Sequence, residues 1–390
     1  MKVKTLFLIT IIWCCLMYAQ AVVAWEGPDI SGYVSQHTVY RVADAYKPDD
    51  DDLMKVEQKL RIDLEKSYSI ANFFVSGEAI YDPKSYRNWV EDDFSAKYRR
   101  TFYRLKAAYM DLGFEDFDLR LGNQVVVWGK SDGMPITDVI TPIDLSEFTI
   151  PEFEDQRLGI PAAKLSYYLR EFTFEGVLIP WFYGNNIPND GHWKLRPDYD
   201  EFESATAKAF FEQGDAYVGG IRIIEEKPEG GWDEVEFGVR VSGLLGNTDV
   251  ALIFFHGRED SPSVNGPTKF IGFEPETPLI EATIDYARMD MVGLNFTRPW
   301  SKFVVRGELA TYINKRFDSR KTLELDPSDP DWPAELEAST TMYEKDMLQL
   351  MVGADYSGIS NVTLSLQFEE QFIMNFDKDD GLIGFATGGI

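Results

Sequence analysis

Apolar and charged residues alternate between positions 54 and 65 of the sequence. The even positions are apolar except for one glutamine, and the odd positions are Lys55, Glu57, Lys59, Arg61, Asp63 and Glu65. A helix would spread these residues around its axis, whereas a period of two places each set on one side of a strand. The pattern therefore predicts a strand with one apolar face and one charged face.

The same period recurs along the chain and brings the number of predicted strands to thirteen. Most of them reach the roughly 9–11 residues that a tilted strand needs to cross a bilayer. Short turns alternate with long loops between the strands, as in outer-membrane barrels, where turns are periplasmic and loops extracellular. The fold expected is all-β, a transmembrane antiparallel up-and-down β-barrel. The other predicted strands are 30–42, 71–81, 103–109, 116–128, 161–170, 172–183, 235–245, 248–257, 279–297, 302–314, 345–356 and 361–371.

The predicted strand number is odd, whereas bacterial outer-membrane barrels close with an even number of strands. We therefore expect at least fourteen strands, and about sixteen, in the closed barrel. Either residues 215–224 supply a further strand, or the chain is truncated at its C-terminus and lacks the closing one.

The first 24 residues have the character of a signal peptide, because two lysines precede an apolar run and small residues ending at Ala24 supply a cleavage site. Both cysteines lie in this leader, which leaves residues 25–390, the expected barrel, without a thiol for a disulfide or a cysteine metal site. The net charge of −27 argues against nucleic-acid partners. An exported, acidic protein without cofactors is the expectation.

Residues 129–160 combine chain-breaking prolines with many apolar side chains. The preceding strand is expected to reach the outer interface at Trp128 and Gly129. Prolines block regular structure, yet the segment is too apolar to remain in water, so we expect it to fold into the lumen and narrow it. The alternative is that it lies across the barrel mouth and only stabilises it.

The charged strand faces are expected to line the lumen. Their two signs are interleaved, which suits either cross-strand ion pairs that brace the wall or a transverse field that orients polar solutes. No metal site is expected, because the acidic loops lack the ligand spacing of a calcium loop. Besides the six residues of 55–65, the expected lining residues are Arg104, Lys106, Asp118, Arg120, Gln124, Arg306 and Glu308 from strands, and Asp138, Asp144 and Arg157 from the inward loop.

The sequence contains no phosphate loop and no His-Glu-x-x-His, and its three histidines are His37, His192 and His256. His256 stands near Glu259 and Asp260, which could form an acid/base pair. A histidine that anchors a loop explains the same residues, and the protein is not expected to be an enzyme.

The stretch LRLGNQVVVWGKSDGMPITDVITPIDLSEF, residues 119–148, and the following DQRLGIP resemble a family of Gram-negative outer-membrane proteins catalogued only as a domain of unknown function and treated as porin-like barrels. The resemblance implies an outer-membrane location, with lipid and lipopolysaccharide as partners. The family's substrates are not established. The matching residues are Arg120, Gly122, Gln124, Trp128, Gly129, Asp138, Pro142, Asp144 and Arg157.

The function expected is a porin-like channel for passive diffusion or uptake of small solutes, with residues 129–160 as its constriction. A first alternative is a plugged barrel for hydrophobic or bulky substrates. A second is a secreted, soluble β-sandwich binding protein, because such sandwiches also show strands with one polar face. The solute, the ion selectivity and the oligomeric state stay open.

Overall fold

The computed structural model describes residues 27–40, 53–83, 101–131, 136–146, 153–187, 221–231, 234–274, 277–319, 321, 331–339 and 341–382. The predicted signal peptide, His192 and residues 215–220 lie outside these residues. Thirteen strands form one antiparallel sheet in chain order. They are β1 (Asp29–Tyr40), β2 (Leu53–Ser67), β3 (Ala71–Tyr81), β4 (Thr101–Gly113), β5 (Phe117–Gln124), β6 (Ile160–Leu169), β7 (Phe172–Ile179), β9 (Glu236–Leu245), β10 (Thr248–Arg258), β14 (Arg288–Trp300), β15 (Phe303–Asp318), β16 (Met342–Ile359) and β17 (Val362–Ile373).

The sheet confirms the predicted all-β fold, and it contains thirteen strands, as many as the sequence pattern predicts. One predicted strand, 279–297, is divided: its first part belongs to β13 (Thr277–Asp285) in a second sheet, and its second part to β14. This small sheet also contains β11 (Ser263–Val264), β12 (Lys269–Glu274) and β8 (Ile221–Glu225), which pairs with β13 in parallel. The candidate strand at 215–224 is thus partly confirmed, but outside the main sheet.

Side chains alternate between the two faces of the main sheet as predicted. On β2, Leu60 is 42% exposed, whereas Lys55 is 2% and Glu57 8% exposed. Apolar side chains are exposed on the convex face of the other strands too, whereas the concave face carries charged and small side chains and, on β6, β7, β10 and β14 to β16, buried apolar ones. The exposed apolar set includes Leu121, Leu165, Leu252, Leu294, Leu309 and Val352. A water-soluble sheet does not normally expose so many apolar side chains along one whole face.

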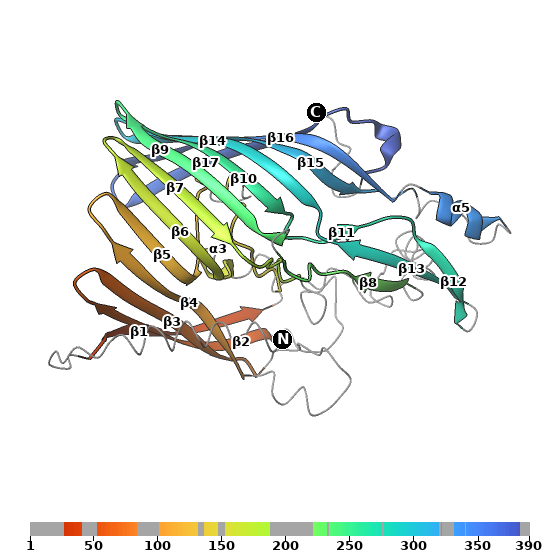
Figure 1. The fold of residues 1–390 in the computed structure, drawn as a ribbon, viewed down its shortest axis with the longest axis horizontal. Coiled ribbons are helices and arrows are strands. Elements are labelled where there is room, and N and C mark those ends of the chain that lie inside the picture. Colours follow the sequence, from red (N-terminus) through yellow and green to blue (C-terminus); the bar gives the residue numbers. More distant parts are fainter. Residues whose placement is uncertain are drawn as a thin grey trace.

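The two ends of the sheet differ, as Figure 1 shows: tight turns lie at one end, and the small sheet and helix α5 (Trp332–Ala338) at the other. Left-handed backbone makes these turns tight, since Arg170, Ser301 and Asn361 have φ of 54°, 57° and 59°, and Gly246 has φ of 63°. Glycine and asparagine adopt this conformation readily. The alternation of short and long connections is therefore built into the fold.

The first and last strands form the edges of the sheet. Asp29 lies opposite Glu65 and Val362 opposite Ile359, so β1 and β17 both run away from the turn end. Among the described residues, β1 pairs with β2 alone and β17 with β16 alone. Because β1 and β17 run in the same direction, they cannot pair with each other in an antiparallel barrel. The expectation that a closed barrel contains at least fourteen strands therefore stays a prediction.

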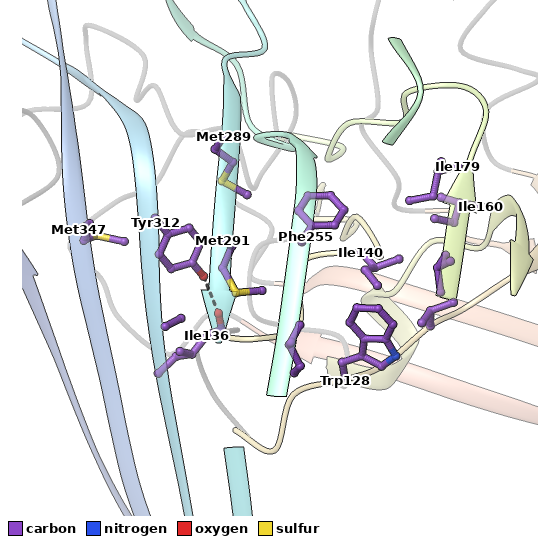
Figure 2. Close-up of a cluster of buried hydrophobic side chains, with 14 of the residues drawn as sticks. Trp128, Ile136, Ile140, Ile160, Ile179, Phe255, Met289, Met291, Tyr312 and Met347 are labelled. Atoms are coloured by element: carbon purple, nitrogen blue, oxygen red, sulfur yellow. Dashed lines mark hydrogen bonds between the residues drawn. The ribbon is translucent and has the colours of Figure 1, made fainter. Parts of the chain in front are cut away.

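The main apolar cluster lies on the concave face rather than between two layers (Figure 2). It joins residues of the connection between β5 and β6 to inward side chains of β6, β7, β10 and β14 to β16. We call this connection, residues 125–159, the inner segment. It includes the short helix α3 (Phe153–Gln156).

Candidate functional site

The inner segment begins earlier than predicted. β5 ends at Gln124, and Trp128, expected at the outer interface, is instead 2% exposed and packs into the concave cluster. That expectation was wrong because Val126 and Trp128 continue the inward positions of Arg120 and Gln124, so their side chains contact the inside of the wall. Together with Ile136 and Ile140, they pack against β10, β14 and β15 through residues such as Phe255, Met291 and Tyr312 (Figure 2).

Two glycines in the wall make room for the inner segment. A Cβ at Gly238 of β9 would lie 2.8 Å from the ring of Trp128, and one at Gly293 of β14 would lie 2.8 Å from Thr137 Cγ2. Real Cβ atoms are not found at such separations. Glycine within a strand often marks close approach by another part of the chain, and here both glycines form hollows that receive a side chain.

Glu308 on β15 is the main polar anchor of the inner segment. Its Oε1 accepts hydrogen bonds from the backbone N–H groups of Lys130 and of Ser131, the second at 2.6 Å. Its Oε2 accepts from the backbone N of Thr137 at 2.9 Å and from Thr137 Oγ1 at 2.7 Å. The residue is 2% exposed. One buried carboxylate therefore satisfies three backbone donors of a segment without regular structure, which would otherwise be costly to bury.

Neighbouring strands add further contacts to the same part of the segment. Asn295 Nδ2 donates to Trp128 O at 2.9 Å, and Tyr312 Oη donates to Ile136 O at 2.6 Å. Arg306 donates to Lys130 O at 3.0 Å. These bonds join the segment to β14 and β15.

The opposite side of the concave face holds the end of the inner segment. Lys59 on β2 pairs with Asp155 at 2.8 Å, and Lys106 on β4 donates to the backbone carbonyls of Asp155 and Arg157 at 2.8 and 3.0 Å. Burial opposes the charge of Asp155, but the hydrogen bond and charge of Lys59 outweigh it and hold the pKa of Asp155 below its ordinary value. Arg104 pairs with Asp144 at 2.7 Å. The segment thus spans from β2 and β4 to β15.

Half of the sixteen predicted lining residues pair with one another, and the others contact residues outside the predicted set. Asp138 pairs with Arg157 within the inner segment, and Asp138 also accepts from the backbone N of Trp128. Arg120 makes two hydrogen bonds with Asp111 on β4. The remaining contacts are Lys55 with Glu57, Arg61 with Asp63, Arg306 with Asp355, Asn72 with Glu65, Tyr168 with Asp118, and Gln124 with Ala162 O.

Three motif positions make contacts within the structure. Gly122 has φ of +131°, and a Cβ there would lie 2.3 Å from Ala108 O on β4. The carbonyl of Pro142 accepts from the backbone N of Leu158 at 2.9 Å, which joins the two arms of the inner segment. Gly129 approaches Asp138 closely, since its Cβ would lie 2.8 Å from Asp138 Cβ.

Several residues of the site were not predicted. Asp111, Glu175, Arg240 and Asp355 lie on the concave face and complete ion pairs there. Asp111 has the parity of the outward Tyr103 and Leu105, and a register shift between β3 and β4 brings it to the concave face, so the strand period did not reveal it. Arg240 alternates with Val239 and Val241, so the strand pattern contained the signal for that residue. Asp155, by contrast, lies in a segment without a period.

The histidine considered for acid/base chemistry has another partner. His256 Nδ1 lies 2.7 Å from Asp290 Oδ1 on β14, and Glu259 is bonded to Lys315 and to the backbone N of Arg316. In the described part of the chain, no cluster of three or more His, Cys, Asp or Glu side chains could hold a metal ion. Among the same residues, no helix is long and apolar enough to span a membrane.

Solved structures of outer-membrane proteins match most of the chain at low identity. OmpF of Salmonella typhi in complex with daunomycin is 9% identical, with a TM-score of 0.41, over 88% of this chain and 78% of that chain. An OmpT of Vibrio cholerae lacking loop L8 is 9% identical, with a TM-score of 0.41, over 89% and 82%. The outer-membrane channel DcaP of Acinetobacter baumannii is 9% identical, with a TM-score of 0.39, over 91% and 80%.

These similarities support no conclusion about individual residues or solutes of this chain. No curated protein matches the chain. Residues 8–388 match the family described as "Protein of unknown function (DUF1302)", and since the match spans nearly the whole chain, the protein belongs to that family.

Proposed function

We propose that this protein is an outer-membrane channel for the passive passage of small solutes, in which the inner segment narrows the lumen. The observation that carries the proposal is the distribution of side chains: apolar residues are exposed on the convex face, and paired charges line the part of the concave face that the apolar cluster leaves open. A convex apolar face suits lipid, and a charged concave face suits water and polar solutes.

The plugged barrel for bulky or hydrophobic substrates is kept as a second candidate, because the inner segment is attached on both sides of the concave face. The soluble β-sandwich is not retained. A sandwich consists of two packed sheets, whereas here the thirteen strands follow one another in a single sheet.

The deciding experiment is conductance of the full chain in planar bilayers, with fractionation of the producing cells. A channel should appear in detergent-extracted outer membranes and conduct ions without further treatment. A folded protein in that fraction that does not conduct would support the plug. Free periplasmic protein would overturn both proposals.

The assignment of the convex face to lipid gives a first prediction. Replacing Leu60 by arginine should destabilise the assembled protein by about 2–4 kcal/mol, because this side chain would face lipid near the middle of β2. Unfolding by urea from lipid vesicles measures the difference. Arg61→Leu, its neighbour on the concave face, is the matched control and should cost less. Labelling from the lipid phase that reaches residue 61 and not residue 60 would refute the facing.

The exposed charge pairs give a second prediction. The side chains of Arg61 and Arg120 are 27% and 28% exposed, whereas Lys59 is 12% exposed and holds the inner segment. Replacing both arginines by glutamine leaves Asp63 and Asp111 unopposed, so ion selectivity should shift toward cations. The reversal potential in a salt gradient measures this shift.

Lys302→Gln is the control for this double variant, because it removes a positive charge from an exposed turn of the same sheet. It should leave the reversal potential unchanged. If the double variant folds and conducts with the parent's reversal potential, the two arginines do not line the path.

A further inference from the structure

A polar cavity lies on the concave face at the turn end of the sheet, away from the inner segment. Its volume is about 410 Å³, within the range of small-molecule sites. The turn at residues 67–72 forms one side, and side chains of β4, β5 and β6 form the other. Those that matter for recognition are Asp111, Asp118, Arg120, Lys164, Ser166 and Tyr168.

One charged pair in this cavity is already neutralised. The Arg120 guanidinium bonds to both carboxylate oxygens of Asp111 at 2.6 and 2.8 Å and lies 3.9 Å from the centre of the Tyr109 ring. A bidentate pair that is also stacked has little capacity for another ion. Arg120 and Asp111 therefore shape the cavity more than they bind in it.

Asp118 and Lys164 differ from that pair. In the described part of the chain, Asp118 accepts a hydrogen bond from Tyr168 Oη at 2.6 Å and is not paired with a cation. Lys164 Nζ lies 3.7 Å from Glu175 Oε1, beyond hydrogen-bond range, and Glu175 is bonded to Arg240 at 2.7 Å. The cavity thus offers a carboxylate and an ammonium group that both have bonding capacity left.

The strand register sets the spacing of these two groups. Asp118 lies opposite Ser166, and Arg120 lies opposite Lys164. Asp118 and Lys164 are therefore diagonal neighbours on one face of an antiparallel pair, with their backbone positions about 7–8 Å apart and both side chains reaching into the cavity. A ligand with a positive and a negative group on adjacent atoms can reach both at once, whereas a ligand with one charge leaves one of them unpaired.

We propose that this cavity binds a small zwitterionic solute of the amino-acid type, with Asp118 receiving its ammonium group and Lys164 its carboxylate. Tyr168 and Ile70 supply apolar surface for the rest of the solute. The inference rests on the proposed channel function, since it places a selective site at the turn end of the path.

The test is calorimetric titration of the detergent-purified full chain with L-valine, isovalerate and isobutylamine. The last two lack the ammonium and the carboxylate group of valine, respectively. L-valine should bind about tenfold more tightly than either analogue, because each analogue leaves one of the two partly buried charges without its partner. Equal affinity for all three would overturn the inference.

Two variants should give crossed results. Lys164→Gln should weaken L-valine and isovalerate about tenfold and leave isobutylamine unchanged, and Asp118→Asn should weaken L-valine and isobutylamine and leave isovalerate unchanged. Lys302→Gln, outside the cavity, should change none of them. The analogue series on the parent decides the question even if a variant fails to fold.

Conductance of the same preparation separates this inference from the channel proposal. A parent that conducts but does not bind L-valine overturns the inference alone. A parent that binds L-valine selectively but does not conduct supports the cavity and overturns the channel.

Discussion

Removing residues 132–148 and joining the ends with a short glycine-serine linker should raise the single-channel conductance severalfold. The strands should persist, because their ladder bonds are made between neighbouring strands and not with the inner segment. Loss of Ile136, Ile140 and Thr137 removes the part that packs on β14 and β15. Planar-bilayer recordings measure the change.

The starting conductance separates the two proposed functions. A constricted channel should change from small to larger conductance, and a plugged barrel from closed to open. Deleting Trp332–Ala338, the helix at the loop end of the sheet, is the matched control and should not change the conductance. A folded variant with the parent's conductance would mean that the deleted part lies outside the solute path.

Glu308→Ala should release the inner segment without removing it. Three backbone N–H groups and the Thr137 hydroxyl would lose their acceptor, and each buried donor left unpaired costs about 1–3 kcal/mol. This is enough to shift the segment from docked to undocked. Hydrogen exchange at the Thr137 amide should become fast, while amides in β2 and β3 stay protected.

Two further variants sharpen this test. Glu308→Gln keeps the shape but has one acceptor oxygen in place of two, so its exchange rate should lie between those of the parent and the alanine variant. Glu335→Ala removes an exposed carboxylate from α5 and should change nothing. Unchanged protection of Thr137 in a folded Glu308→Ala protein would contradict the anchoring role of Glu308.

Much of the sheet could be predicted because a strand with one apolar face carries its period in its own sequence. The charged set of β2 lies on the concave face as expected, and the family expected from the Trp128-Gly129 and Thr141-Pro142 motifs is confirmed. The boundary between β13 and β14 could not be found, since both strands alternate and nothing in the period marks the break at residues 286–287.

The hydrogen-bond and ion-pair partners of a side chain were harder to predict than the face of the sheet on which it lies. Arg120 and Asp111 meet because the register of β4 and β5 places them opposite each other, and a register depends on both strands together. The role of Glu308 depends on backbone N–H groups, which every non-proline residue has and which no sequence pattern reveals. The hollows at Gly238 and Gly293 likewise become meaningful only when the side chain that fills each one is known.

The attachment of the inner segment on both sides of the concave face has a mechanical consequence. A single curved sheet can flatten or bend further with little loss of its ladder bonds, because bending distributes small twists over many strands. The contacts of Lys59 and Lys106 at one side and Glu308 at the other fix the distance between β2 and β15 across the hollow. The inner segment therefore acts as a tie that sets the curvature of the sheet, and the width of the passage follows from the length of that tie.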